Sequence, residues 1–253
     1  MSGYLDAPDG VVAMAHRGFS LDGLENSMAA FSAAVELGLH YVETDAHATS
    51  DGIAVALHDD ALDRTTDGHG RVRDLPWREV RRARIGGIEP VPLLEDLLAA
   101  WPDLRVNIDV KEAAAAAPVA AVIERTRAHD RVCVGSFSRA RRLATLALLS
   151  RSVVTSAATG EAARFLAAAR LGRPARGVAR QVDCLQVPQR AGPLRVVDAR
   201  TVAQAHRAGL AVHVWTVNDP ATMDRLLDVG VDGLISDRAD LLVEVLRRRG
   251  LRD

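Results

Sequence analysis

Short runs of apolar and β-branched residues alternate along the chain with longer segments in which apolar residues recur at helical spacing. The short runs predict strands at 11–15, 41–46, 105–110, 131–137, 152–156, 183–187, 211–216 and 232–236. The clearest predicted helices are 27–38, 198–209 and 223–230. Each ends in a glycine, the residue that most readily forms a left-handed C-cap. This alternation is typical of parallel βα units.

One apolar run, 53–57, follows the second strand after only six residues, with Asp51-Gly52 in the gap. A parallel crossover needs a dozen or more residues, so the two runs are expected to pair as an antiparallel hairpin. Eight parallel strands remain, and eight βα units in 253 residues predict an α/β fold, a (β/α)8 TIM barrel. The turn-rich stretch 60–92 breaks the rhythm and is expected to form a small surface insertion before a helix that starts near Leu93.

Composition narrows the class of protein further. The net charge of −1 provides no broad attraction to nucleic acid or anionic lipid, and no run of about 20 apolar residues predicts a membrane span. No signal peptide is apparent at the N-terminus, so a cytoplasmic protein is expected. Cys133 and Cys184 lie in apolar runs and are expected to be buried, reduced thiols. We expect one domain over 1–253, with its core at about 11–247; nothing in the sequence indicates an oligomeric state.

Carboxylates gather where predicted strands end, which is the edge of a TIM barrel that carries active sites. Glu43 and Asp45 are two residues apart in a strand and therefore share a face, and Asp109 ends the next barrel strand. Three carboxylates in one small mouth repel one another unless a cation compensates them. An all-oxygen donor set favours Mg²⁺ or Ca²⁺ over zinc.

Two basic residues lie beside these carboxylates. Arg17 follows the first strand and Lys111 follows the third. They leave open an alternative in which the acidic and basic side chains form a buried ionic cluster without a metal. In either case, the positive charge suits an anionic substrate such as a phosphate ester.

The candidates for proton transfer are His16 and His58, because imidazole titrates near neutral pH and both follow strands at the predicted mouth. Trp215 ends the seventh strand. Its side chain either forms a hydrophobic platform for the substrate or packs at the rim of the barrel, and the sequence is equally compatible with both roles. The arginines in 136–142 and 187–195 are expected to lie on a solvated surface rather than to bind a head group.

Together these motifs resemble the glycerophosphodiester phosphodiesterase family, in the family's order and from about Val11 to Arg247. The motifs are "HRG" (16–18), "ENSMAAFSAAVELG" (25–38), "ETDAHATSDGIAVALHDDALDRTT" (43–66), "NIDVK" (107–111) and "VWTVND…GVDGLISD" (214–237). The resemblance implies a barrel with a small insertion after the hairpin. It also implies a metal-dependent hydrolase that cuts a glycerophosphodiester, a small-molecule substrate, into sn-glycerol 3-phosphate and an alcohol.

The same resemblance implies a role for each matching residue. It makes His16 and His58 the general acid and base, Arg17 and Lys111 the phosphate contacts, Glu43, Asp45 and Asp109 the ligands of Mg²⁺ or Ca²⁺, and Trp215 part of the substrate pocket. The chain departs from the family pattern at Leu24, where proline is usual, and at Asp109, where glutamate is usual. The first change affects a turn, whereas the shorter carboxylate at 109 leaves the metal preference open.

Three other functions are compatible with parts of this pattern. A lysophospholipase D-like enzyme would need an apolar rim to meet lipid, and the Arg-rich insertion has only Trp77 as an aromatic residue. A non-catalytic phosphate-binding barrel would not require both histidines. A metal-dependent sugar isomerase would give no reason for the pair of Arg17 and Lys111, and the fold alone does not fix the function.

Overall fold

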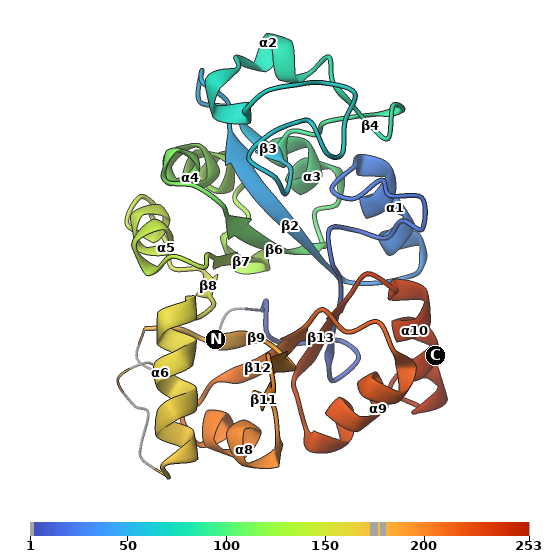
Figure 1. Cartoon of the computed structure of the whole chain (residues 1–253), viewed down its shortest axis with the longest axis vertical. Helices are drawn as coiled ribbons and strands as arrows, with labels where there is room; N and C mark the ends of the chain where they lie inside the picture. Colours follow the sequence, from blue (N-terminus) through green and yellow to red (C-terminus); the bar gives the residue numbers. More distant parts are fainter. Residues whose placement is uncertain (1–2, 173–176, 178–180, 253) are drawn as a thin grey trace.

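The computed structural model describes residues 3–172, 177 and 181–252, and within them parallel strands form a barrel surrounded by helices (Figure 1). The parallel strands are β1 (Val12–Ala15), β2 (Tyr41–Ala48), β6 (Arg105–Val110), β7 (Val132–Gly135), β8 (Val154–Thr155), β9 (Cys184–Pro188), β12 (Ala211–Trp215) and β13 (Gly233–Ser236). Their order is β8-β7-β6-β2-β1-β13-β12-β9. The predicted barrel of eight parallel strands is therefore confirmed.

The pairing between neighbouring barrel strands is weakest between β8 and β9, where the barrel closes. A single parallel bridge joins Ser156 to Cys184 there. Strand β8 is shorter than the predicted run 152–156, and it pairs with β7 through only two residues. The barrel is nearly closed, so the strand ends face a common mouth.

Helices pack around the strands and place their apolar faces inward. Their bounds are α1 (Met28–Glu36), α3 (Leu94–Ala100), α4 (Ala116–Thr126), α5 (Arg139–Leu146), α6 (Thr159–Arg170), α8 (Ala199–Arg207), α9 (Pro220–Val229) and α10 (Ala239–Arg248). Short 3₁₀ turns occur at Ala113–Ala115 and His129–Arg131. Ser27 caps α1 by accepting a hydrogen bond from the Ala30 N–H. Helix α9 begins earlier than predicted, because Asp219 caps it and Pro220 fits its first turn.

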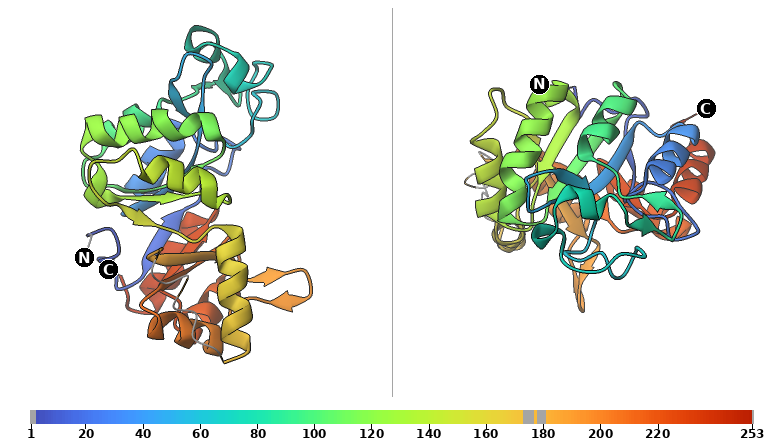
Figure 2. Two further views of the ribbon diagram at one scale, coloured as in Figure 1. Left: turned by 90° about the vertical axis from the view of Figure 1, so that its left-hand side faces the viewer. Right: turned by 90° about the horizontal axis from the view of Figure 1, so that it is seen from above.

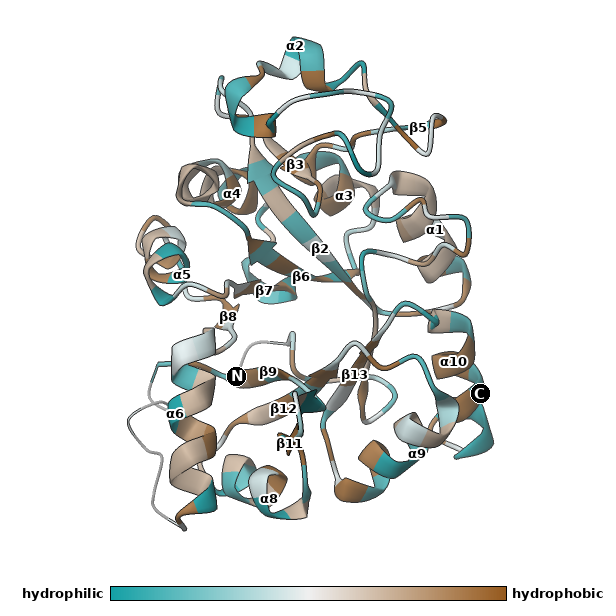
Figure 3. Cartoon of the chain, viewed as in Figure 1, coloured by the Kyte–Doolittle hydropathy of each residue, from teal (hydrophilic) through white to brown (hydrophobic). Residues whose placement is uncertain are grey.

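The segment between β3 (Ala54–Ala56) and α3 forms the predicted insertion. Strand β3 pairs antiparallel with β2, which confirms the hairpin. The insertion contains a 3₁₀ turn (Val72–Asp74), α2 (Trp77–Val80), β4 (Arg84–Ile85) and β5 (Glu89–Pro90). It has its own small hydrophobic core, which includes Leu62, Val80 and Ile85, although Figure 3 shows many hydrophilic residues along its chain.

Most of the core lies between the strands and the helices, and a second cluster fills the barrel interior. Cys133 and Cys184 belong to that interior cluster as buried free thiols, as predicted. Across the described residues, none of the helices has the length and apolar character needed to cross a bilayer. The sequence did not predict the hairpin of β10 (Arg190–Ala191) and β11 (Leu194–Arg195), which projects from the barrel in Figure 2.

Candidate active site

A cavity of about 460 Å³ opens at the carboxyl ends of the barrel strands. All eight residues that the sequence singles out line it: His16, Arg17, Glu43, Asp45, His58, Asp109, Lys111 and Trp215. They come from the ends of four barrel strands and from the segment after β3. The structure therefore brings together side chains that are up to 199 positions apart in the sequence.

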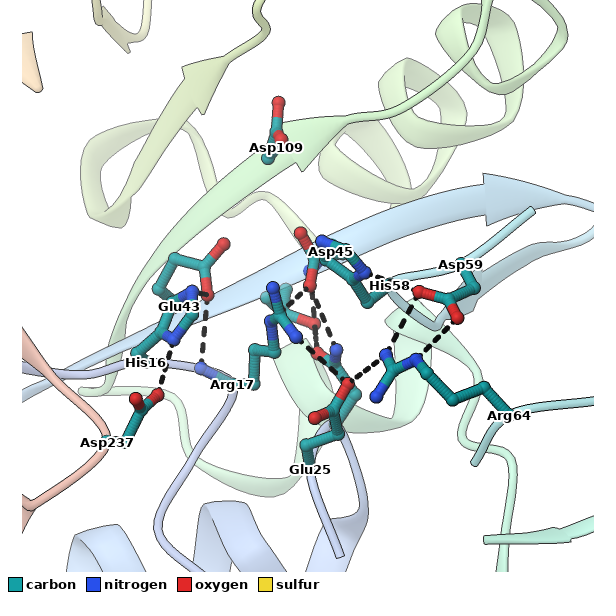
Figure 4. A network of polar contacts seen from close by, with 12 residues as sticks. His16, Arg17, Glu25, Glu43, Asp45, His58, Asp59, Arg64, Asp109 and Asp237 are labelled. Atoms are coloured by element: carbon teal, nitrogen blue, oxygen red, sulfur yellow. Dashed lines mark hydrogen bonds and ion pairs between the residues drawn. The ribbon is translucent and has the colours of Figure 1, made fainter. Parts of the chain in front are cut away.

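The three carboxylates come from two neighbouring strands. Asp45 on β2 is the register partner of Asp109 on β6, and Glu43 lies two residues earlier on the same face as Asp45. All three are buried, with Glu43 6% and Asp45 1% exposed. Figure 4 shows Glu43 and Asp45 along β2, with Asp109 on β6 above them.

Two permanent cations partly compensate this charge. Lys111 Nζ lies 2.7 Å from Asp45 Oδ1 and 2.9 Å from Asp109 Oδ2. Arg17 Nε lies 3.1 Å from Asp45 Oδ2 as an ion pair. Burial alone would raise the pKa of Asp45, but Lys111 and Arg17 outweigh it and hold the pKa below its usual value. Asp45 is therefore ionised at neutral pH.

Glu43 is compensated far less. Its Oε2 accepts a hydrogen bond from the Arg17 backbone N–H at 3.0 Å and lies 3.8 Å from His16 Nε2. Burial, together with the neighbouring charge of Asp45, raises the pKa of Glu43 to about 8. Three carboxylates face only two permanent cations, and the raised pKa means that Glu43 holds a proton at neutral pH when no further cation is present.

The backbone around residue 17 explains why the motif requires these residue types. Arg17 has a φ of 57°, which turns its N–H toward Glu43. Gly18 follows with a φ of 79°, and a Cβ atom there would lie 2.7 Å from the Ala30 carbonyl carbon. The glycine is needed because α1 packs directly against this turn. Asn26, also buried, donates to Asp45 Oδ2 at 3.0 Å and fixes that carboxylate from the other side.

Each histidine is oriented by its own carboxylate. His16 Nδ1 donates to Asp237 Oδ1 at 2.6 Å, and His58 Nδ1 donates to Asp59 Oδ1 at 2.6 Å. Since a carboxylate can only accept, Nδ1 carries the hydrogen in both rings and Nε2 is left for proton exchange. Burial alone would lower the pKa of His16, but Glu43 and the Asp237 hydrogen bond outweigh it and raise the pKa.

An ion-pair network connects His58 with Arg17 (Figure 4). Arg64, from the insertion, donates to both oxygens of Asp59, at 2.5 and 3.0 Å, and to Glu25 Oε1 at 2.7 Å. Glu25 Oε1 also accepts from Arg17 Nη1 at 3.0 Å. The insertion thus contributes directly to the positions of the catalytic candidates.

The donor set fits a hard divalent cation. Three buried carboxylates line one cavity, and burial together with the neighbouring Asp45 raises the pKa of Glu43, so a bound cation would favour its ionised form. In the arrangement that the described residues adopt, however, Asp45 and Asp109 share the ammonium of Lys111, and no group of three or more His, Cys, Asp or Glu side chains converges closely enough to hold a metal ion. The metal ligands therefore stay a prediction.

Two predictions about neighbouring residues have different outcomes. Trp215 lines the cavity and contacts Phe137 edge to face, with ring centroids 5.8 Å apart. The expectation that the arginines of 136–142 lie on a solvated surface is wrong for Arg142, which is 0% exposed and lies 3.0 Å from the buried Glu161. This pair ties α5 to α6 behind the cavity. In 187–195, Arg190 and Arg195 are exposed, as expected.

Sequence reasoning missed the residues that orient the site. Asp237, Glu25 and Arg64 all fall within the quoted motifs, so a signal for them was present. Their partners are 221, 8 and 39 residues away, and no periodic pattern shows such pairings. Asp237 reaches His16 because β1 pairs with β13, whereas Glu25 and Arg64 meet where the insertion lies against the segment before α1.

Comparison with known proteins identifies the family of this site. The family model described as "Glycerophosphoryl diester phosphodiesterase family" matches residues 16–241. The Mycobacterium tuberculosis protein named "Probable glycerophosphodiester phosphodiesterase 2" is 50% identical over 244 residues, covering 95% of this chain and 92% of that protein. A Caldanaerobacter subterraneus glycerophosphodiester phosphodiesterase is 28% identical, covering 94% and 99% of the two chains.

Solved structures show the same fold. An Agrobacterium tumefaciens glycerophosphodiester phosphodiesterase superposes with a TM-score of 0.74 at 23% identity, covering 92% of this chain and 97% of that one. An Oleispira antarctica phosphodiesterase in complex with the product sn-glycerol-3-phosphate gives a TM-score of 0.74 at 23% identity, covering 92% and 96%. With most of its length matched by the family model, and half of its residues identical to the mycobacterial relative, the chain belongs to the glycerophosphoryl diester phosphodiesterase family.

Proposed function

We propose that this glycerophosphodiester phosphodiesterase hydrolyses its substrate to sn-glycerol 3-phosphate and an alcohol by acid–base catalysis with His16 and His58. The observation that carries the proposal is the pair of imidazoles at one cavity, each held through Nδ1 by a carboxylate. That arrangement leaves two Nε2 atoms for proton transfer in the cavity that Arg17 and Lys111 also line. Binding alone would not need two oriented imidazoles.

Arg17 and Lys111 are proposed to bind the phosphodiester oxygens. Both line the cavity, and both already neutralise Asp45. When Glu43 is ionised, the three carboxylates outnumber the two cations, so a monoanionic diester would be repelled without a further cation. We therefore propose that Glu43, Asp45 and Asp109 hold Mg²⁺ or Ca²⁺, which supplies positive charge to the phosphate and stabilises charge that develops on it.

The proposed reaction has two steps. By analogy with the family, one imidazole removes the proton from the substrate's own glycerol 2-hydroxyl, whose oxygen forms a bond to phosphorus. The bond from phosphorus to the alcohol oxygen breaks, and the second imidazole donates a proton to that oxygen. Water then opens the cyclic phosphate with the proton transfers reversed. Arg17 and Lys111 stabilise the oxygens on phosphorus during both steps.

The test is an assay of released sn-glycerol 3-phosphate from a panel of glycerophosphodiesters in Mg²⁺ and in Ca²⁺. Wild-type protein should turn over at least one diester, whereas His16→Asn and His58→Asn should lower kcat by roughly 10²-fold or more while the proteins remain folded. Near-normal turnover in either variant would remove the histidine from the mechanism. Binding of diesters without turnover would favour a non-catalytic phosphate-binding barrel.

A further inference from the structure

The cavity continues beyond the charged residues along an apolar wall. Helix α6 contributes Thr159, Ala162, Ala163 and Leu166, whose spacing places them on one helix face. The base of the β10–β11 hairpin faces them with residues that include Val196. Figure 2 shows this hairpin projecting beside α6, and Arg170 at the end of α6 donates to the Arg195 carbonyl. The wall is thus built from two elements outside the barrel strands.

The described residues of this wall carry no charge. Among the residues that the structure describes, the charged or titratable side chains that line the cavity are His16, Arg17, Glu43, Asp45, His58, Asp109 and Lys111. Charged residues of α6 point elsewhere, since Glu161 is buried against Arg142 and Arg164 donates to the Gly160 carbonyl. A charged alcohol placed along the wall would lose hydration without gaining an ionic partner.

The pair of aromatic side chains that lines the same cavity does not replace that partner. Phe137 and Trp215 are close to perpendicular, with an interplanar angle of 70°. The Lys111 ammonium lies 5.7 Å from the centre of the Phe137 ring. A substrate ammonium near Phe137 would therefore meet an existing cation, and the usual cation–π attraction would be offset by repulsion.

We propose that the wall formed by α6 and the β10–β11 hairpin is a subsite for an uncharged apolar chain attached to the phosphodiester. Burial of such a chain against alanine, leucine and valine side chains is favourable, whereas a choline or ethanolamine group gains nothing there. The inference rests on the proposed function and names its substrate class. The chain is carried either on the leaving alcohol or as an acyl group on the glycerol, and both forms have the same apolar chemistry.

The first experiment compares a charged and an uncharged head group of the same shape. Glycerophosphocholine is compared with glycerophospho-3,3-dimethylbutanol, in which a neutral carbon replaces the choline nitrogen. The diester with the uncharged head group should have a kcat/KM roughly tenfold higher or more, since that group gains burial without loss of ionic hydration. Equal or faster cleavage of the choline diester would overturn the proposal.

The second experiment measures how kcat/KM depends on the length of the apolar chain and on where the chain is attached. In diesters of butanol, hexanol and octanol, used below their aggregation limits, kcat/KM should rise about threefold for each added methylene until the wall is filled. A short-chain lysophosphatidylcholine series tests an acyl chain on the glycerol in the same way. A rise in only one series identifies where the chain is attached, and flat profiles in both series would contradict an apolar subsite.

A matched pair of variants on α6 locates the subsite. Ala163→Asp puts a carboxylate on the wall, whereas Ala167→Asp puts one on an exposed position of the same helix that does not line the cavity. Ala163→Asp should lower the ratio of kcat/KM for the longest preferred diester to kcat/KM for glycerophosphocholine roughly tenfold. Ala167→Asp should change neither substrate, and equal effects of the two variants would refute this location.

The outcomes also separate this inference from the function on which it rests. If no diester of any kind is hydrolysed, the proposed function fails and the subsite proposal fails with it. If diesters are hydrolysed but the choline ester and its neutral isostere react equally, the subsite proposal alone is wrong.

Discussion

His16 Nδ1 lies 2.6 Å from Oδ1 of Asp237, so a residue after the first strand is oriented by a residue after the last. Strands β1 and β13 pair in parallel, and this pairing brings the two residues together although 221 positions separate them. Asn218 supports the arrangement by donating to Asp237 Oδ2 at 2.8 Å and accepting from the Asp237 N–H at 2.9 Å. The pairing of β1 with β13 therefore positions one of the two proposed catalytic imidazoles.

Replacement of the orienting carboxylate should affect turnover more than binding. In Asp237→Asn, the side chain can donate to His16 Nδ1 and thereby favour the wrong tautomer. We expect kcat to fall roughly 10²-fold with KM changed little, measured by steady-state release of sn-glycerol 3-phosphate. Asp240→Asn is the control, because Asp240 pairs with Arg238 at the N-terminal end of α10. Equal kcat values for the two variants would show that Asp237 does not orient a catalytic group.

Arg64 should act as a positioning residue for His58. Its guanidinium joins Asp59 to Glu25, and without it Asp59 remains bonded to His58 and Glu25 to Arg17, but the two carboxylates are no longer linked. Arg64→Met should lower kcat roughly tenfold through misplacement of His58. The side chain is 49% exposed, and exposed ion pairs contribute about 0–1 kcal/mol, so the Tm should change little.

Arg71→Met provides the matched control for that change. Arg71 also lies in the insertion, but it pairs with Asp60 at 3.6 Å on the surface. Its kcat should equal that of the wild type. A loss of Tm in Arg64→Met that fully explains its lower activity would assign Arg64 a stabilising role instead.

The free energy of unfolding should depend on pH, and a bound cation should change that dependence. The pKa of Glu43 rises from an ordinary value of 4.5 to about 8 in the folded chain. Without a cation, stability should fall as pH rises between these values, because the folded state then has to release a proton that it binds more tightly than the unfolded state does. Mg²⁺ or Ca²⁺ should therefore raise Tm more at pH ~8.5 than at pH ~5.5.

Thermal unfolding of Glu43→Gln provides the comparison. This variant should have a flatter pH profile and should gain less from added cation. EDTA should abolish the activity of the wild type, and Mg²⁺ or Ca²⁺ should restore it. Full activity in chelator, with no cation effect on Tm at either pH, would favour the ionic cluster without a metal.

Variants at Asp109 test the proposed metal ligand at which this chain differs from the usual family pattern. Asp109→Glu restores the residue that the family usually has and keeps a carboxylate near Lys111. We expect it to retain activity within about threefold and to change the ratio of Mg²⁺ to Ca²⁺ affinity, since the longer side chain moves the donor oxygen. Asp109→Asn should lower cation affinity measured by calorimetry. An unchanged affinity in Asp109→Asn would remove this residue from the ligand set.

Local patterns in the sequence predict the barrel and the composition of its mouth. The two-residue spacing of Glu43 and Asp45 sets their common face, and Asp51-Gly52 predicts the hairpin that carries His58 into the cavity. Burial of Arg142 was not predictable in this way, because arginine is usually exposed and its partner Glu161 lies on another helix. The apolar wall was also missed, since it depends on how α6 and the projecting hairpin face each other.

The most direct test of the central claim is a crystal structure of the protein with Mg²⁺ or Ca²⁺ and sn-glycerol 3-phosphate. It should show one ion bound by Glu43, Asp45 and Asp109, with Nε2 of His16 and of His58 each within about 3.2 Å of a ligand oxygen. Lys111 still joining Asp45 to Asp109 with no ion beside them, and the two imidazoles turned away from the phosphate, would contradict it.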